Sequence, residues 1–275
     1  MSQALDDLDA ERLQSLLRTR AYGRSLELHA STDSTNDDAK RAAVAGAPDG
    51  HVVLADGQRA GRGQHGRAWA SPPGTDLYLS IVARPRLSLA ALPPLTLAVG
   101  VAIAEAVERL LGDTASARAQ VKWPNDVWLA GKKCSGVLVE TNSGAPLDAI
   151  GATDAARVVV VIGIGLNVNR LQWPDELRES ATSLRAARPG APALDRGMVL
   201  AALLLSVEQW VDRLVEGGGY AIAAALEARL ALRGRRVRCA DVEGTLAGVA
   251  PSGAIRIATE AGVRELLAGR IVAID

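Results

Sequence analysis

Three glycines and two arginines share residues 61–67, which read GRGQHGR. Glycine lets the backbone turn successive amide groups inward, and each arginine carries a permanent positive charge. A loop of this composition suits an anionic group such as phosphate. An ordinary solvated connection can have the same composition, so the loop alone does not decide between the two. It lacks the Gly-Lys-Ser ending of a P-loop, and its glycine spacing does not fit a Rossmann fingerprint.

A second group of charged residues lies in the apolar, tryptophan-containing segment KWPND at residues 122–126, and Lys133 follows at the start of the next expected strand. Burying Lys122 and Asp126 without partners would be costly, which indicates either an internal ion pair or a bound ligand. For Lys133 taken alone, an exposed lysine in a hairpin is the simpler interpretation.

Hydroxyl and amide side chains occur together at Ser34, Thr35 and Asn36, and Gln58 ends a strand just before the glycine loop. These groups supply donors for a carbonyl and acceptors for N–H groups, which is what a neutral urea-like ligand requires. A helix that begins here would add free backbone amides. The alternative is that Ser34 only caps this helix, with Asp37 as its capping-box partner.

Periodicity and turn residues place these motifs at helix starts, strand ends and loops. We predict helices over residues 9–20, from Ser34 to residue 45, between Pro94 and Gly112, from Asp195 to the glycines at 217–219, and onward to Arg233. Strands are predicted over residues 51–56, 77–83 and 158–169, and residues 120–129 are predicted to pair with 135–140. Short alternating segments at 236–239, 245–249, 255–258 and 270–274 predict a small β domain after residue 233.

Composition excludes several classes of protein. Lys plus Arg and Asp plus Glu both number 31, so no overall positive charge attracts nucleic acid. The most apolar stretch, residues 158–166, is too short to cross a bilayer, and the acidic start of the chain is unlike a secretory signal. We therefore expect a cytoplasmic protein with no membrane partner. The two cysteines are too few for a disulfide framework, and the three histidines have no metal-binding spacing, so we predict no protein metal site.

Some chemically attractive residues have simpler interpretations. Cys134 lies between a lysine pair and a serine, yet no histidine partner is identifiable, and we expect a small buried residue rather than a nucleophile. Trp123, Trp128 and Trp210 are expected in the core, although Trp123 could also contact a ligand.

Taken together and in order, these segments resemble the biotin protein ligase family over about residues 31–275. The similar segments are residues 34–36, Gln58, the GRGQHGR loop, KWPND with Lys133 and Gly136, and GIGLN at residues 163–167. The resemblance implies an α+β fold in which a class II aminoacyl-tRNA synthetase-like catalytic domain has a mixed sheet with flanking helices, followed by a small SH3-like β-barrel. We expect an N-terminal helix or extension over residues 1–24, the catalytic domain over 25–232 and the barrel over 233–275.

The resemblance also implies a role for each matched residue. Arg62, Lys122 and Lys133 would be catalytic, because they neutralise charge on the biotin carboxylate and the α-phosphate of ATP. The implied biotin-binding residues are Ser34, Thr35, Asn36, Gln58, Arg62, Gly63, Gln64, Lys133 and Gly136. The implied nucleotide-binding residues are Arg67, Trp69, Asn125, Asp126 and Asn167, and the separate roles of the last three stay open.

The implied reaction is the ATP-dependent activation of biotin to biotinyl-5'-AMP and its transfer to a lysine of the carrier domain of a biotin-dependent carboxylase. Mg²⁺ is implied by the ATP chemistry. One helix before Ser31 is too little for a DNA-binding winged helix, so we expect a monofunctional enzyme, monomeric or homodimeric, rather than a repressor. Relatives often have arginines where this chain has Gln64 and His65, and this difference bears on how tightly the adenylate is retained.

Two alternatives remain open. A lipoate or octanoate ligase would share the fold, but its aliphatic substrate would leave the polar groups of Ser34, Thr35 and Gln58 without partners. A biotin-sensing regulator would bind biotin without transferring it, and the release of pyrophosphate distinguishes it from an enzyme.

Overall fold

The computed structural model describes residues 8–112, 118–142 and 158–274. Residues 1–7 of the predicted N-terminal extension and residue 275 of the predicted barrel lie outside the described residues. The elements are α1 (Ala10–Leu16), β1 (Leu26–His29), α2 (Thr35–Val44), β2 (His51–Ala55), η1 (Gln64–Gly66), β3 (Leu77–Ala83), η2 (Leu89–Ala91), α3 (Pro94–Leu111), β4 (Ala119–Lys122), β5 (Asp126–Leu129), β6 (Lys132–Thr141), β7 (Val160–Leu166), α4 (Asp175–Arg178), α5 (Arg196–Leu226), β8 (Arg236–Cys239), β9 (Val242–Val249), β10 (Ile255–Thr259), β11 (Gly262–Leu266) and β12 (Ile271–Ala273).

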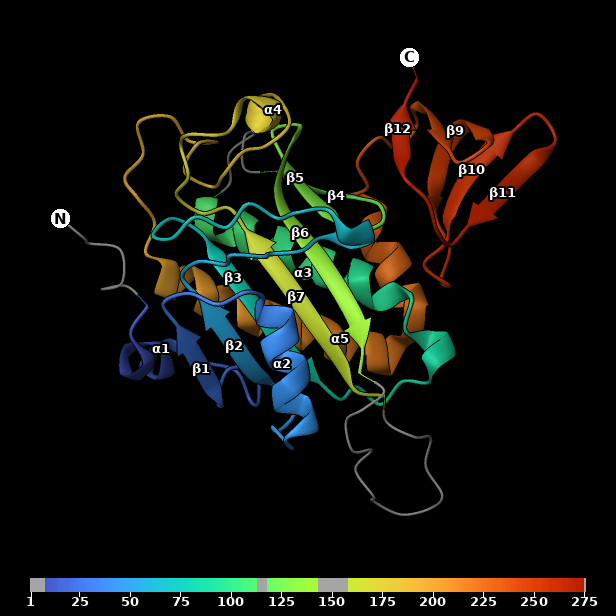
Figure 1. The fold of residues 1–275 in the computed structure, drawn as a ribbon. Helices are drawn as coiled ribbons and strands as arrows, with labels where there is room; N and C mark the ends of the chain where they lie inside the picture. Colours follow the sequence, from blue (N-terminus) through green and yellow to red (C-terminus); the bar gives the residue numbers. More distant parts are fainter. Residues whose placement is uncertain (1–7, 113–117, 143–157, 275) are drawn as a thin grey trace, which may run out of the picture.

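A seven-stranded sheet forms the centre of the larger part of the chain (Figure 1), in the order β1-β2-β3-β7-β6-β5-β4. β1 and β2 run parallel, and the other neighbouring strands run antiparallel. The predicted α+β fold with a mixed sheet is therefore confirmed. Every residue of β2 and β3 is buried, because helices cover both faces of the sheet.

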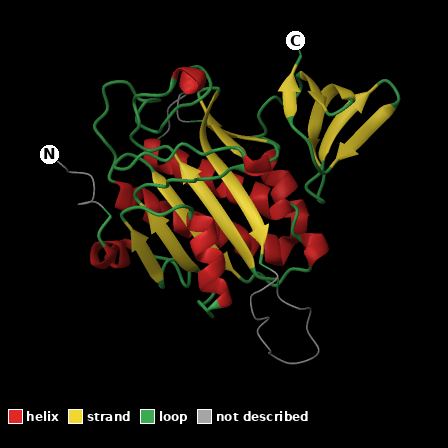
Figure 2. Ribbon diagram, in the orientation of Figure 1, coloured by secondary structure: helices red, strands yellow, loops and turns green. Residues whose placement is uncertain are grey.

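The helices divide between the two faces of this sheet (Figure 2). α2 packs on β2, β3 and β7, while α3 packs on β4, β5 and β6 and against α5. α3 begins with Pro94 at its first turn and ends at Gly112, whose φ of 77° is the left-handed conformation that glycine favours. Its apolar residues are buried nearly all round, as the sequence predicts for an internal helix.

The C-terminal strands form a separate five-stranded antiparallel sheet (Figure 1), in the order β11-β10-β9-β8-β12. It contacts the larger sheet through the turn after β9, where the indole N–H of Trp123 donates to the carbonyl of Gly253 at 3.0 Å. The predicted small β domain contains one strand that the sequence analysis missed, β11. All of its side chains are exposed or only half-buried, so the alternation that marks a strand is absent.

Residues 120–129 do not form one strand, and that prediction was wrong. They form the hairpin of β4 and β5, with a turn at Trp123, Pro124 and Asn125. Proline has no backbone N–H for a ladder bond, so the strand is interrupted there. The turn is held against the third strand, because the amide of Val137 donates to the carbonyl of Asn125 at 2.9 Å.

Two helix boundaries also differ from prediction. α1 ends at Leu16 rather than residue 20, because Leu17 is extended. The predicted helix end at the glycines 217–219 is confirmed, because Gly218 has the non-helical angles φ 59° and ψ −166° and divides α5 into two helical parts. The second part is the further helix predicted after the glycines, and its Ile222 and Leu226 are buried, but it ends at Leu226 rather than at Arg233. The segment after Leu226 contains no further helix up to Arg233.

The predicted capping box at α2 does not form. Ser34 occupies the N-cap position but makes no side-chain capping hydrogen bond, and the carboxylate of Asp37 pairs with Arg62 instead. The hydroxyl of Ser34 is therefore not committed to capping the helix.

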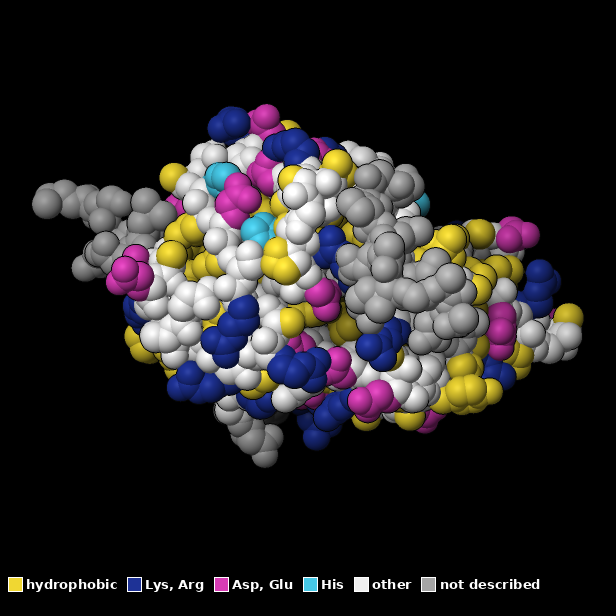
Figure 3. Space-filling view, turned by 90° about the horizontal axis from the view of Figure 1, so that it is seen from below, with side chains coloured by type: hydrophobic (Ala, Val, Ile, Leu, Met, Phe, Trp, Pro, Cys, Tyr) yellow, Lys and Arg dark blue, Asp and Glu magenta, His cyan; other side chains and the backbone are white. Residues whose placement is uncertain are grey.

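Within the described part of the chain, no helix is both long and apolar enough to cross a bilayer. On the face shown in Figure 3, Lys and Arg side chains are interspersed with Asp and Glu, and no large area of a single charge sign is visible.

Candidate active site

The predicted site residues come from distant parts of the sequence, and the fold brings them all to one pocket of about 390 Å³. The first turn of α2, strands β5 to β7 and the glycine loop line this pocket. The predicted residues in its wall are Ser34, Thr35, Asn36, Gln58, Arg62, Gly63, Gln64, Arg67, Trp69, Lys122, Asn125, Asp126, Lys133, Gly136 and Asn167.

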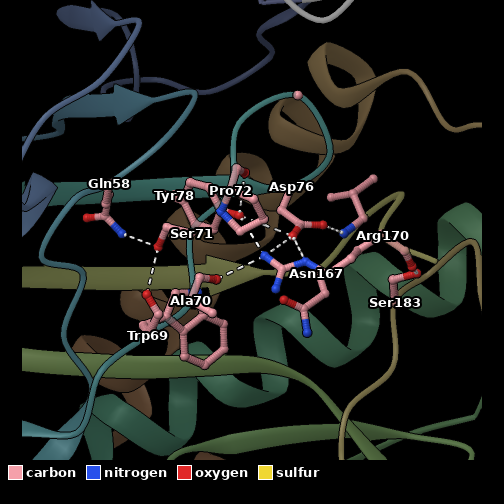
Figure 4. A network of polar contacts seen from close by, with 12 residues as sticks. Gln58, Trp69, Ala70, Ser71, Pro72, Asp76, Tyr78, Asn167, Arg170 and Ser183 are labelled. Carbon is pink, nitrogen blue, oxygen red and sulfur yellow. Dashed lines mark hydrogen bonds and ion pairs between the residues drawn. The ribbon is translucent and has the colours of Figure 1, made fainter. Parts of the chain in front are cut away.

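One end of the pocket is neutral and polar. The backbone N–H of Thr35 donates to Oε1 of Gln58 at 2.9 Å, and Oγ1 of Thr35 lies 3.2 Å from the same oxygen. Nε2 of Gln58 donates to Oγ of Ser71 at 3.0 Å, and Ser71 in turn donates to the carbonyl of Trp69 (Figure 4). These hydrogen bonds fix the orientation of the Gln58 amide, so that its carbonyl oxygen faces Thr35 and its NH₂ group faces Ser71.

Both the NH₂ group and the carbonyl oxygen of the Asn36 side chain have protein partners. Its Nδ2 donates to Oε2 of Glu140 at 2.7 Å, and its Oδ1 accepts from the hydroxyl of Ser80 at 2.6 Å. Lys40 also donates to Glu140 at 2.7 Å. Partial burial opposes ionisation of Glu140, but the hydrogen bonds from Asn36 and Lys40 outweigh it and lower the pKa of the carboxyl group.

Glycines in the paired strands β6 and β7 leave room for the side chains that cross the sheet. A Cβ on Gly165 would lie 2.4 Å from the indole of Trp69, and one on Gly136 would lie 2.8 Å from it. A Cβ on Gly163 would lie 2.1 Å from Oδ1 of Asn36. Trp69 therefore lies directly on the sheet backbone, and its buried indole N–H has no hydrogen-bond partner in the protein.

The other end of the pocket carries positive charge. Nζ of Lys133 lies 2.6 Å from Oδ1 of Asp126 and 5.0 Å from the centre of the Trp69 ring. Lys122 lies opposite Asp126 across the hairpin. The expected internal ion pair of Asp126 does form, but its partner is Lys133. Lys133 is half-buried in the pocket wall rather than exposed in a turn.

Lys122 lies over the ring of Trp128, with Nζ 4.8 Å from the ring centre. Burial lowers its pKa, and the positive charges of Arg270, Lys133 and Arg67 act in the same direction, against the opposing effect of Asp126. The positive charges in this region therefore exceed what Asp126 can neutralise, and the region favours an anionic ligand. The expectation that Trp128 is a core residue was wrong, because Trp128 is only half-buried and lines the pocket. Trp123 and Trp210 are buried as predicted.

The glycine loop closes one side of the pocket and is tied to α2 by an ion pair. Both terminal nitrogens of Arg62 contact the carboxylate of Asp37, with NH1 to Oδ2 at 2.7 Å. The hydrogen bond from Arg62 lowers the pKa of Asp37. His65 has a φ of 56° and is exposed, like Arg67, so this part of the loop is held mainly by its own turn.

Two predicted asparagines are held by backbone groups. Nδ2 of Asn125 donates to the carbonyl of Val137 at 3.0 Å, and Nδ2 of Asn167 donates to the carbonyl of Thr182 at 2.9 Å. Cys134 is fully buried, as predicted, and burial raises the pKa of its thiol to about 12. A thiol with this pKa is not a nucleophile at neutral pH.

Comparison with known proteins identifies the family. The model of the biotin/lipoate A/B protein ligase family matches residues 28–152. The bifunctional ligase/repressor BirA of Bacillus subtilis is 33% identical over 93% of this chain and 76% of its own length. The biotin--[acetyl-CoA-carboxylase] ligase of Mycobacterium tuberculosis is 36% identical over 84% of this chain and 80% of its own length. This chain belongs to the biotin protein ligase family.

A solved biotin protein ligase has the same fold. The Aquifex aeolicus enzyme, determined in complex with biotin and ATP, is 29% identical and aligns with a TM-score of 0.74 over 90% of this chain and 98% of its own. As a member of the biotin protein ligase family, the present chain is an enzyme of the ligase class.

The sequence analysis of this ligase missed several residues of the pocket. Arg170 lines the wall, and it is buried between Asp76, at 2.7 Å from Nε, and the carbonyl of Ala70, at 2.9 Å (Figure 4). Trp173 stacks on Arg170, with the guanidinium 4.7 Å from the ring centre. Arg270 reaches the pocket from the smaller sheet. Arg170 comes shortly after a buried strand, and this position in the sequence was the one signal that could have identified it. No such signal exists for Arg270, because its place in the pocket depends on how the two sheets pack.

Proposed function

We propose that this chain uses ATP to convert biotin to biotinyl-5'-AMP and then transfers the biotinyl group to a lysine of a carrier domain of a biotin-dependent carboxylase. One observation carries the proposal. A single pocket has a neutral hydrogen-bonding end at Thr35 and Gln58 and a positively charged end at Lys122 and Lys133. Biotin has a urea ring at one end and a carboxylate at the other, so it matches both ends. The relatives named as biotin ligases support the same substrate.

The chemistry needs two transfers. A biotin carboxylate oxygen attacks the α-phosphorus of ATP, the bond to the β-phosphate oxygen breaks, and pyrophosphate leaves. The amine of the acceptor lysine then attacks the acyl carbon, an amide forms, AMP leaves and the amine loses a proton. Both steps concentrate negative charge on oxygen, and fixed cations stabilise that charge because they need no reorganisation.

We propose that Lys133 and Lys122 neutralise the carboxylate and the α-phosphate during the first step, and that Arg62 joins them when a ligand competes with Asp37 for it. Asp126 holds Lys133 in place through the 2.6 Å ion pair. Ser34, Thr35, Asn36, Gln58, Gly63, Gln64 and Gly136 form the proposed biotin end, and Arg67, Trp69, Asn125, Asp126 and Asn167 the proposed nucleotide end.

Mg²⁺ is part of the proposal, because it bridges and neutralises phosphate oxygens. Within residues 8–112, 118–142 and 158–274, no three His, Cys, Asp or Glu side chains gather in a way that could hold a metal ion. The donor set therefore suits an ion that arrives bound to the phosphates and keeps several waters. Asp126 is the carboxylate in the pocket wall that would face it.

We propose a monofunctional, cytoplasmic enzyme rather than a DNA-binding repressor. The described N-terminal helix α1 packs against α5, and Leu13 and Leu17 belong to the core of the larger sheet. A gel-shift assay at physiological salt should show no sequence-selective DNA binding, and a salt-resistant selective shift would contradict this. Sedimentation with and without biotin and ATP will separate a monomer from a homodimer.

We also propose that the larger sheet and its helices form a class II aminoacyl-tRNA synthetase-like domain over residues 25–232, and that residues 233–275 form an SH3-like barrel. The largely antiparallel sheet supports the first part, and the five antiparallel strands after residue 233 support the second.

The test of the proposed function is incubation with ATP, Mg²⁺, biotin and an isolated carrier domain, followed by mass measurement of the carrier. We expect an increase of one biotinyl group that depends on ATP and on biotin. Lipoate and octanoate are the decisive competitors, because the matched family model covers lipoate ligases as well. Transfer of lipoate in preference to biotin would overturn the proposal.

A further inference from the structure

Ser80 lies in the middle of β3, is completely buried and forms no part of the pocket wall. Its hydroxyl oxygen is 2.6 Å from Oδ1 of Asn36 and 2.8 Å from Oγ1 of Thr35. A serine hydroxyl has a single proton, so it can donate to only one of these two partners. Which partner receives the proton decides what Thr35 presents to a ligand.

The orientation of Asn36 settles that choice. A carboxylate only accepts hydrogen bonds, so the contact between Asn36 and Glu140 at 2.7 Å requires the NH₂ group of Asn36 to face Glu140. The carbonyl oxygen of Asn36 must then face Ser80, and it can only accept. The proton of Ser80 is therefore committed to Asn36, at 2.6 Å.

Thr35 must consequently donate its own proton to Ser80. If it did not, two hydroxyl oxygens would face each other at 2.8 Å through lone pairs alone. With its proton directed at Ser80, Oγ1 of Thr35 is left as an acceptor. The alternative partner of this proton, Oε1 of Gln58, is farther away at 3.2 Å.

Gln58 is fixed as an acceptor by a second chain of bonds. The backbone N–H of Thr35 can only donate, so Oε1 of Gln58 must face it, at 2.9 Å. At the other end of the amide, the proton of Ser71 goes to the carbonyl of Trp69, so Ser71 accepts from the NH₂ group of Gln58 (Figure 4). Oγ1 of Thr35 and Oε1 of Gln58 thus form a pair of acceptors 3.2 Å apart.

We propose that Ser80, together with Asn36 and Glu140, is a set of positioning residues that keeps Thr35 an acceptor, so that this end of the pocket selects a ligand with an N–H donor. The inference rests on the proposed biotin ligase function and adds residues that determine its specificity. A ring N–H of biotin relieves the repulsion between the two acceptor oxygens. A ligand with a ring oxygen at the same point adds a third lone pair and is rejected. In this scheme Asn36, which lines the biotin end of the pocket, sets the donor and acceptor roles there through Ser80.

The experiment uses the full chain and three probes: biotin and the two cyclic carbamate analogues in which one or the other ring N–H is replaced by oxygen. Calorimetry gives the Kd of each probe for the parent and for Ser80→Ala. We expect the parent to bind one carbamate on the order of 100-fold more weakly than biotin, the scale for an unmatched buried polar group. In Ser80→Ala the hydroxyl of Thr35 is free to turn and donate to the ring oxygen. The ratio of the two Kd values should therefore fall at least about fivefold.

A second variant tests the far end of the chain of bonds. Glu140→Gln replaces an obligate acceptor by an amide that can also donate, so Asn36 and then Ser80 can reverse and let Thr35 donate. The Kd ratio should again fall. The matched control is Lys40→Ala, which removes the other partner of Glu140 but keeps the carboxylate, and its ratio should equal that of the parent. Ser206→Ala, a fully buried serine in α5, controls for the loss of a buried hydroxyl.

The outcomes are distinguishable. If the parent does not bind biotin, the proposed function fails. If the parent binds biotin but Ser80→Ala and Glu140→Gln weaken all three probes by the same factor, the residues are only structural and the inference is wrong. If Ser80→Ala does not fold, Glu140→Gln decides alone, because its side chain is partly exposed at the edge of the network.

Discussion

Nζ of Lys133 lies 2.6 Å from Oδ1 of Asp126, inside a pocket whose wall contains several cations but, among the described residues, no second carboxylate. The pair keeps a lysine in the pocket at a modest desolvation cost, since each partner neutralises the other. An arriving polyanion can share this lysine with Asp126. The charge is therefore positioned before the substrate binds.

We expect Lys133→Ala to slow pyrophosphate release during adenylate formation by about 100- to 1,000-fold, because one stabilising cation is lost from the site of charge development. Circular dichroism should show an intact fold. Lys132→Ala is the matched control, since the ammonium group of Lys132 reaches the backbone carbonyl of Arg178 at 3.2 Å and lies outside the pocket wall. A normal rate in Lys133→Ala would remove this lysine from the mechanism.

Lys122 gives a prediction about pH. Burial lowers its pKa below the usual 10.5, so its positive charge is lost at a lower pH than that of an exposed lysine. The rate of adenylate formation should fall as the pH rises through this lowered pKa. Lys122→Arg keeps the charge at all of these pH values, and its alkaline limb should move to higher pH even if the maximum rate is lower. An unchanged alkaline limb in Lys122→Arg would show that another group titrates.

The ion pair between Arg62 and Asp37 leads to a prediction about retention of the intermediate. Arg62→Ala removes a fixed charge and its paired hydrogen bonds from the loop that covers the pocket, so biotinyl-5'-AMP should dissociate faster and label lysines on bystander proteins. Gly63→Val should have the same direction of effect, because it restricts the loop backbone.

The measurement is the off-rate of preformed adenylate together with bystander labelling. Arg59→Ala is a control, because this neighbouring arginine pairs with exposed Asp33 and does not line the pocket. If Arg62→Ala binds the adenylate as tightly as the parent and releases it no faster, the loop does not retain the intermediate.

Gly165→Ala should disturb the packing of the pocket wall without adding or removing a polar group. The new methyl group would lie 2.4 Å from the indole of Trp69, so the ring must leave the sheet surface. We expect at least tenfold weaker ligand binding with a smaller change in thermal stability, since the ring is only half-buried. Gly217→Ala, where the nearest atom is a side-chain methyl at 3.1 Å, is the control. Unchanged binding in Gly165→Ala would show that Trp69 need not pack on the strand.

The sequence by itself singled out residues that line the pocket and most of the elements that carry them. Ser34, the glycine loop, KWPND and Lys133 are recognised by type and local order, and helix caps and apolar periodicity are likewise properties of neighbours in the chain. These local signals failed where adjacent residues in the sequence indicated a longer element than the structure has. Pro124 split an apparent strand into β4 and β5, and α1 ends at Leu16 because Leu17 is extended, although the sequence predicted a helix to residue 20.

Only the tertiary structure decided which polar groups face one another. Ser80 meets Asn36 because β3 pairs with β7 in a register that sets Ser80 opposite Gly163, where the missing side chain leaves room for the Asn36 amide. Glu140 reaches the same amide from β6, 104 residues along the chain. No pattern in a single segment encodes such a pairing, because it depends on the register of three strands at once. The sequence therefore gives the chemical type of each polar side chain, while the fold decides which of them donate and which accept hydrogen bonds.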